Sequence, residues 1–242
     1  MKKTLVIGES CRDIFIYCSA ERLCPDVPVP VLGTISSLEN GGMAKNVQRN
    51  ILSLTNDCDI YTNNNWNNIT KTRYMHEQSN HMFFRVDSPH DIKRANINDI
   101  NLEYELIIIS DYNKGFLLEE DIENITSRHK NVFLDTKKIL GPWANGCKYI
   151  KINDYEYKSS EKFIDNTLVD KIIHTMGPNG CNFQGKNYPV EGVEVKDSSG
   201  AGDTFMAGLA ATYSQTGDII VGIEAANRYA AEAVKRRGVS II

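Results

Sequence analysis

The stretch 197–205, with the sequence Asp-Ser-Ser-Gly-Ala-Gly-Asp-Thr-Phe, constrains the fold of this chain more than any other. The glycines on either side of Ala201 let the backbone approach a ligand closely. Apolar residues follow at helical spacing, so the turn opens a helix. A helix N-terminus presents unpaired N–H groups and the positive end of its dipole, which favours a phosphate. Asp203 lies in the first helical turn, either as a stabilising helix-start carboxylate or as a functional acid.

Length and composition limit the class of protein. A chain of 242 residues with 41% hydrophobic residues can bury one sizeable core, so we expect a single domain, 1–242, with a small lid. The net charge of −4 without long charge runs argues against nucleic acid or a membrane surface as partner. No segment has the length of a membrane span or a signal-peptide core. Six cysteines without Cys-x-x-Cys spacing indicate reduced thiols, so we expect a cytoplasmic protein.

Apolar runs that end in polar residues recur in the second half of the chain. The runs 106–109, 132–134, 149–152 and 172–173 are followed by Ser110-Asp111, Asp135, Asn153 and His174-Thr175. Ligands of open α/β sheets bind outside the carboxyl ends of the strands. Any single polar residue is explained by turn chemistry, but four in series favour a binding edge. With a buried strand at 5–7 and amphipathic helices between the runs, we predict an α/β fold with a mostly parallel central sheet.

Two segments lie outside this alternation of strands and helices. Prolines interrupt the apolar runs of 13–38, which bars that segment from a central sheet position. The runs 69–75 and 82–87 flank the turn-forming Gln78-Ser79-Asn80 and predict a β-hairpin. We expect a small β-sheet lid built from about 13–38 and 69–87. The region 56–68 carries no predicted element, and its polar part 63–68 is interpreted as a loop.

Several motifs carry a resemblance to one family. The stretch 197–203 resembles the signature of the ribokinase-like (PfkB) carbohydrate kinases, with Ser198 and Ser199 in place of the usual threonine or valine. The chain also has sequences similar to the family's Asp-Tyr-x-Lys-Gly, Asp-Pro-Lys, Asn-x-x-Glu and Thr-x-Gly-x-x-Gly motifs, at 111–115, 135–137, 153–156 and 175–180. The resemblance implies the three-layer ribokinase-like fold with a β-sheet lid.

Within the family, the chain is most similar to the heptose-7-phosphate kinases of the ADP-heptose pathway. The similarity lies in Pro28-Val29-Pro30-Val31 and in the run 41–47. Lys45 and Gln48 depart from the usual Gly-Gly-Ala-Ala-Asn-Val-Ala. Relatives carry a further strand and helix near 56–68, so this chain is shortened there.

The resemblance assigns roles to three groups of residues. Asp203 would be the catalytic base, beside an anion hole formed by the amides of Gly200, Ala201 and Gly202. ATP and Mg²⁺ would be bound by Asn153 and Glu156, the metal mainly through water, and the nucleotide also by Thr175, Gly177, Gly180 and Asn227. The sugar would be bound by Asp13, Gly41, Gly42, Asn46, Lys71, Arg73, Asp111 and Lys137. An Asn and a Glu three residues apart fall on one face of a starting helix, which suits a hydrated Mg²⁺.

Some of these residues have structural explanations of equal weight. Lys71 and Arg73 are equally well explained as solvated lid charges or as ligands of a substrate phosphate. The glycines of 175–180 would also serve a hairpin turn, and Asn227 would also fit the polar face of a helix.

The resemblance implies an ATP- and Mg²⁺-dependent kinase acting on the anomeric hydroxyl of D-glycero-D-manno-heptose 7-phosphate. Two alternatives stay open: a kinase for another sugar or sugar acid, such as a ketodeoxygluconate, and a shortened, inactive homologue that binds nucleotide or sugar. Relatives often carry a nucleotidyltransferase domain of which this sequence has no trace, so we expect one activity. Relatives also often dimerise through the lid, which would cover its exposed edge and implies a homodimer.

Overall fold

The computed structural model describes residues 2–89 and 91–241, and its main feature is an eight-stranded sheet. The strands are β1 (Lys2–Gly8), β4 (Cys58–Tyr61), β7 (Tyr104–Asp111), β8 (Val132–Thr136), β9 (Tyr149–Asn153), β10 (Ile172–Thr175), β11 (Cys181–Phe183) and β12 (Lys186–Tyr188). Their order is β12-β11-β10-β9-β8-β7-β1-β4. The six strands from β10 to β4 are parallel, whereas β11 and β12 are antiparallel. The carboxyl ends of the parallel strands therefore meet along one edge.

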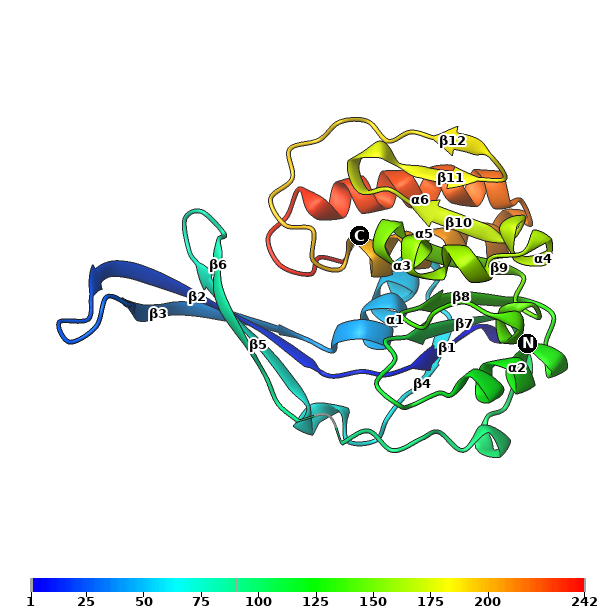
Figure 1. Ribbon diagram of the computed structural model, residues 1–242, viewed down its shortest axis with the longest axis horizontal. Helices are drawn as coiled ribbons and strands as arrows, with labels where there is room; N and C mark the ends of the chain where they lie inside the picture. Colours follow the sequence, from blue (N-terminus) through cyan, green and yellow to red (C-terminus); the bar gives the residue numbers. More distant parts are fainter. Residues whose placement is uncertain (1, 90, 242) are drawn as a thin grey trace.

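Helices cover both faces of this sheet (Figure 1). The α-helices are α1 (Gly42–Thr55), α2 (Glu119–Arg128), α3 (Asp154–Ser160), α4 (Asn166–Val169), α5 (Ala201–Thr216) and α6 (Ile219–Val234). The 3₁₀ helices are η1 (Trp66–Asn68), η2 (Ile97–Asp99), η3 (Pro142–Ala144), η4 (Glu161–Phe163) and η5 (Gly177–Asn179). No helix within the described residues is long and apolar enough to cross a bilayer.

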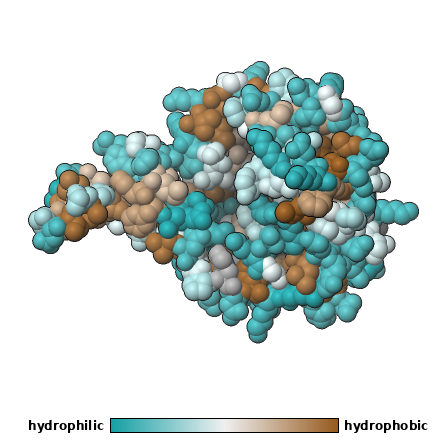
Figure 2. Space-filling model, in the orientation of Figure 1, coloured by the Kyte–Doolittle hydropathy of each residue, from teal (hydrophilic) through white to brown (hydrophobic). Residues whose placement is uncertain are grey.

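A second, small sheet projects from the α/β body as an arm (Figure 1). Its strands are β2 (Arg12–Leu23), β3 (Pro30–Asn40), β5 (Thr70–His76) and β6 (Met82–Asp87), in the order β3-β2-β5-β6. Proline starts β3, which lies at the edge as its missing N–H requires. Hydrophobic residues lie among hydrophilic ones on the arm in Figure 2. The inner residues Phe15, Tyr17 and Met75 pack against Val239 near the C-terminus.

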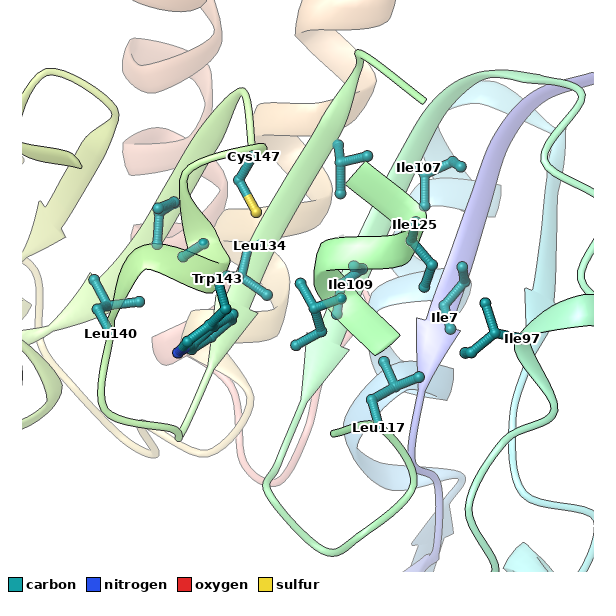
Figure 3. Close-up of a cluster of buried hydrophobic side chains, with 14 of the residues drawn as sticks. Ile7, Ile97, Ile107, Ile109, Leu117, Ile125, Leu134, Leu140, Trp143 and Cys147 are labelled. Atoms are coloured by element: carbon teal, nitrogen blue, oxygen red, sulfur yellow. The ribbon is translucent and has the colours of Figure 1, made fainter. Parts of the chain in front are cut away.

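Successive side chains of each strand point to opposite faces of the main sheet, which creates one hydrophobic core on each face. Ile107, Ile109 and Leu134 pack on the α2 side, where Leu117, Ile125 and Trp143 cover them (Figure 3). Leu106, Ile108 and Phe133 point the other way, toward α1, α5 and α6. Because each of the central strands is covered on both faces, these strands consist of nearly continuous apolar runs. The burial fixes the register of the strand ends that carry the site.

The predicted fold class is confirmed, with differences at the edges of the main sheet. The predicted hairpin is β5–β6, and Gln78-Ser79-Asn80 lies in the connection between these strands. Strand β4 was not predicted, because its four residues show no clear alternation and acquire their conformation by pairing with β1. The short hairpin β11–β12 was missed for the same reason, since tertiary pairing decides such strands.

Candidate active site

The site is organised by the N-terminus of α5. Gly200 precedes this helix with φ 78°, a left-handed conformation that favours glycine. Its carbonyl accepts the amide of Thr204 at 2.9 Å, which begins the helical hydrogen bonds. The amide of Ala201 makes a 3.2 Å hydrogen bond to the carbonyl of Ser198. Helix starts leave their first amides without intrahelical acceptors, so α5 points a partial positive charge at the edge of the sheet.

A buried ammonium group lies against this helix end. A Cβ atom on Gly202 would lie 2.9 Å from Nζ of Lys151, so a larger residue there would displace that group. The side chain of Lys151 is 4% exposed and donates to Oδ2 of Asp135 at 2.8 Å. The sequence reasoning missed Lys151. The signal was a charged residue inside the apolar run of β9, two residues before Asn153.

Asp203 is buried in the first turn of α5 and has one donor on each oxygen. The hydroxyl of Tyr112 donates to Oδ1 at 2.8 Å, and Nδ2 of Asn46 donates to Oδ2 at 3.3 Å. Burial raises the pKa of Asp203 to about 6; Asp135 adds to the rise, and Tyr112, Lys151 and Asn46 oppose it. A carboxyl that ionises just below neutral pH is well suited to accept a proton.

The small sheet brings a charged pair and a lysine toward this carboxylate. Arg73 of β5 donates to Asp13 of β2 through Nε at 2.9 Å and through Nη2 at 3.4 Å. Nζ of Lys71 lies 3.3 Å from Sδ of Met43 and 5.5 Å from the ring centre of Tyr112. Arg73 and Lys71 therefore differ in their partners: Arg73 is paired with the carboxylate of Asp13, whereas the ammonium of Lys71 lies near Met43 and Tyr112.

The turn before α1 has an unusual backbone. Gly42 has φ +56°, and a Cβ there would lie 2.8 Å from Sγ of Cys11. Met43 follows with φ 44° and ψ −125°, a conformation that costs a non-glycine residue about 1–3 kcal/mol. Gly41 accepts the amide of Cys11 at 3.1 Å. The strained turn places Asn46 against Asp203, and strain of this kind is concentrated at functional sites.

The side chain of Asp111 is bound by Lys138 and Thr136. Its carboxylate is fully buried, at 2.8 and 2.9 Å from Nζ of Lys138 and 2.5 Å from Oγ1 of Thr136. Asp111 therefore fixes the carboxyl ends of β7 and β8. The family resemblance groups Asp111 with the sugar ligands, and its contact with a sugar stays a prediction.

The residues predicted to bind nucleotide and metal include a capping box at the start of α3. Oδ1 of Asn153 accepts the amide of Glu156 at 3.0 Å, and Oε2 of Glu156 accepts the amide of Asn153 at 2.8 Å. Nζ of Lys137 also binds Oε1 of Glu156 and lies 5.5 Å from the ring centre of Tyr112. Among the described residues, no three His, Cys, Asp or Glu side chains form a ligand cluster for a metal. The buried oxygen atoms here suit a hydrated Mg²⁺ rather than direct ligation.

The remaining predicted nucleotide residues have structural partners. The turn from β10 to β11 closes with a 2.7 Å bond from the amide of Met176 to Gly180. At Gly180, φ is +79° and a Cβ would lie 2.1 Å from the carbonyl oxygen of Tyr188. Nδ2 of Asn227 donates to that carbonyl at 2.9 Å. Thr175 and Gly177 belong to the same hairpin turn, so contact of these four residues with a nucleotide stays a prediction.

Comparisons with known proteins agree with this geometry. The model of the pfkB family carbohydrate kinases matches residues 109–242, more than half of the chain. The bifunctional protein HldE of Helicobacter pylori (strain G27) is 27% identical over 299 alignment positions, covering 98% of this chain and 64% of that protein. HldE of Bradyrhizobium diazoefficiens is 24% identical, covering 100% and 61%. The alignment is longer than the 242 residues of this chain, so the relative carries internal segments that this chain lacks.

Solved structures share the fold at low identity. The ribokinase of Thermotoga maritima superposes with a TM-score of 0.76 at 16% identity, covering 99% of this chain and 95% of that one. The ribokinase of Arabidopsis thaliana, complexed with ribose and ATP, gives a TM-score of 0.70 at 12% identity, covering 98% and 94%. This chain spans less than two thirds of the HldE proteins but nearly all of these ribokinases. With a family model matching over half of its sequence, the chain belongs to the PfkB family of carbohydrate kinases, phosphotransferases with an alcohol group as acceptor.

Proposed function

We propose that this chain is an ATP- and Mg²⁺-dependent kinase that phosphorylates the anomeric hydroxyl of D-glycero-D-manno-heptose 7-phosphate. One observation carries the kinase proposal: a buried carboxylate with a raised pKa, Asp203, lies in the first turn of a helix whose N-terminus faces the binding edge. A binding protein that lacked catalysis would have no need of a base at this place. The match to HldE proteins supports the heptose substrate.

The proposed reaction needs few groups from the protein. Asp203 accepts the proton of the sugar hydroxyl as its oxygen attacks the γ-phosphorus of ATP, and the bond to ADP breaks. The N-terminal amides of α5, from Gly200 to Gly202, stabilise the charge that spreads over the transferred group. The ammonium of Lys151 lies beside Gly202 and adds positive charge at the same place.

The residues near α3 fit a hydrated magnesium ion and the phosphates of ATP. Asn153 and Glu156 supply oxygen atoms at the carboxyl end of β9, and Lys137 lies beside them. When bound, Mg²⁺ would supply positive charge that neutralises the phosphate oxygens. The chain's own part is to hold the triphosphate between Lys137 and the start of α5.

The small sheet is proposed to act as a lid, about 13–38 and 69–87, over the sugar. Lys71 faces Tyr112 and Met43 and is the lid's candidate ligand for a substrate phosphate. Arg73 would act indirectly, by orienting Asp13 toward the sugar hydroxyls.

The substrate proposal predicts which sugar phosphate drives ADP release. In a coupled assay with Mg-ATP, the heptose 7-phosphate is expected to react and ketodeoxygluconate, fructose 6-phosphate and ribose are expected not to. Reaction with one of the other sugars alone would replace the substrate and leave the kinase proposal standing. No ADP release with any sugar, while nucleotide binding persists, would favour an inactive homologue.

We further propose that a second copy of the chain docks on the outer face of the small sheet. Alternate residues of β6, Met82, Phe84 and Val86, point to this face and are 42–53% exposed. Phe84 stacks on Tyr74 of β5 with ring centres 4.6 Å apart. An exposed apolar face beside free edge strands is the usual mark of an interaction surface.

Sedimentation velocity tests this contact. The protein is expected to sediment as a dimer, and Phe84→Lys is expected to shift it to the monomer because a charge would be buried. The matched control is Phe163→Lys, at an exposed phenylalanine outside the small sheet. A monomeric parent chain, or dimers unchanged by Phe84→Lys, would contradict the proposal.

A further inference from the structure

Within the described residues, Tyr112 is the one residue outside the predicted site whose side chain donates a hydrogen bond to the carboxylate of Asp203. Its hydroxyl donates to Oδ1 at 2.8 Å, while Asn46 holds the other oxygen at 3.3 Å. The contact joins the loop after β7 to the first turn of α5, across 91 residues of sequence. A hydrogen bond to a charged group is stronger than one between neutral groups.

The backbone of Tyr112 is itself fixed by a buried acid. Oε2 of Glu9 accepts the amide of Tyr112, and Oε1 accepts the amide of Lys114, both at 2.8 Å. Glu9 is fully buried at the end of β1, and burial followed by the nearby Asp111 raises its pKa. These two hydrogen bonds to one buried carboxylate restrict the backbone of the loop after β7. The position of the Tyr112 phenol is therefore set by the backbone as well as by the side-chain rotamer.

The ring of Tyr112 lies between the two sides of the site. Nζ of Lys71, from the small sheet, and Nζ of Lys137, from the nucleotide side, are each 5.5 Å from its centre. Burial, together with the charges of Asp203 and Asp135, raises the pKa of the phenol well above its usual value. The hydroxyl therefore keeps its proton and acts as a donor to Asp203 across the working pH range.

We propose that Tyr112, held in place by Glu9, is a positioning residue that orients the carboxylate of Asp203 and keeps it ionised for proton transfer. This rests on the proposed function of Asp203 as the base. One lone pair of Oδ1 is occupied by the phenol, so the carboxylate presents its remaining lone pairs to the sugar hydroxyl in a fixed plane. A carboxylate held in this way populates fewer unproductive orientations.

Other charged residues also interact with Asp203, and this determines which substitution can isolate the hydrogen bond from Tyr112. Asp135 of β8 raises its pKa, Lys151 of β9 lowers it, and Lys137 interacts with it from the loop after β8. Substituting any of these residues would change both charge and packing. Tyr112→Phe keeps the ring between the two lysines and removes only the donor, so it isolates the hydrogen bond.

Steady-state kinetics of Tyr112→Phe over pH 5 to 9 tests the proposal. We expect the acid limb of kcat/KM to move up by about one pH unit, so that kcat/KM falls about tenfold at pH 5 and about twofold at pH 7, with most of the loss recovered above pH 8. KM for ATP is expected to stay unchanged. The phosphate of the sugar titrates equally in all variants, so a difference between variants reports on the enzyme. The control is Tyr61→Phe, which removes a phenol that bonds the carbonyl of Asn96, outside the site.

Carboxyl ¹³C NMR separates this proposal from the proposed function. In Tyr112→Phe, the resonance of Asp203, assigned with Asp203→Asn, is expected to titrate about one pH unit higher than in the parent. A parent chain that phosphorylates no sugar would refute the function, yet the NMR shift would still report whether Tyr112 holds the carboxylate. An acid limb and an Asp203 titration equal to those of the parent would overturn the positioning role. A fall in melting temperature alone, with unchanged pH profile, would reduce Tyr112 to a packing residue and also overturn it.

Discussion

Asp203→Asn is expected to lower kcat by roughly 10²–10⁴-fold, because an amide cannot accept the proton of the sugar hydroxyl. The substitution changes neither the size of the side chain nor the amides of α5, so the affinity for Mg-ATP is expected to stay within about twofold of the parent. Isothermal titration calorimetry with a non-hydrolysable ATP analogue measures that affinity, and single-turnover kinetics measure the chemical step.

The same substitution is expected to leave the fold at least as stable. Burial raises the pKa of Asp203 to about 6, above the value of an unfolded chain. Between pH 4 and 6 the folded state then binds more protons, so stability falls as pH rises, and the full penalty of the buried charge is present above pH 6. Removing that charge at pH 7 relieves the penalty. Oδ1 of Asn46, which has no partner among the described residues, can accept from the new amide after a flip.

Stability therefore serves as the internal control for the loss of activity. We expect the melting temperature of Asp203→Asn at pH 7.5 to equal or exceed that of the parent, and the difference to vanish near pH 4. Asp203→Ala is a poorer test, since it leaves Tyr112 and Asn46 without their acceptor. Turnover equal to the parent in a stable Asp203→Asn protein would exclude this carboxylate as the base.

Much of this fold could be predicted because its signals are local. The polar residues at strand ends, the glycine turn before α5 and the Asp218 cap of α6 are all visible within a few positions of sequence. Asp218 accepts the amides of Ile220 and Val221, as its place before a helical pattern predicts. Strand β4 and the hairpin β11–β12 were missed because their pairing partners are distant in the sequence.

The site itself could be predicted only as a set of residue types. The family resemblance assigns candidate roles to Asp203, Asn153 and Glu156, but it does not predict which side chains contact one another. The contact of Tyr112 with Asp203 and the burial of Lys151 with Asp135 arise from strands that the sheet brings together. The ion pair of Asp111 with Lys138 arises in the same way and could not be predicted from the motif alone. Sequence patterns specify the elements, whereas the partner of a polar side chain is decided by sheet order.

Lys151→Met is expected to destabilise the fold by about 3–5 kcal/mol, because it leaves the carboxylate of Asp135 buried without its partner. The two side chains are 4% and 5% exposed and lie 2.8 Å apart. Unfolding in urea measures the loss. Lys148→Met is the matched control, since that lysine precedes β9 and bonds the side chain of Asn131 away from the site. We expect the control to cost less than about 1 kcal/mol.

Activity and stability can be separated with a second substitution in the same pair. Lys151→Met combined with Asp135→Leu removes both charges, and replacing a buried ion pair by apolar groups is often neutral. We therefore expect the double variant to recover most of the lost stability. Its kcat is expected to stay about tenfold or more below the parent, because positive charge beside Gly202 is missing where the transferred phosphoryl group develops charge. Recovery of both stability and kcat would show that Lys151 serves the fold alone and that the amides of α5 suffice for the phosphoryl group.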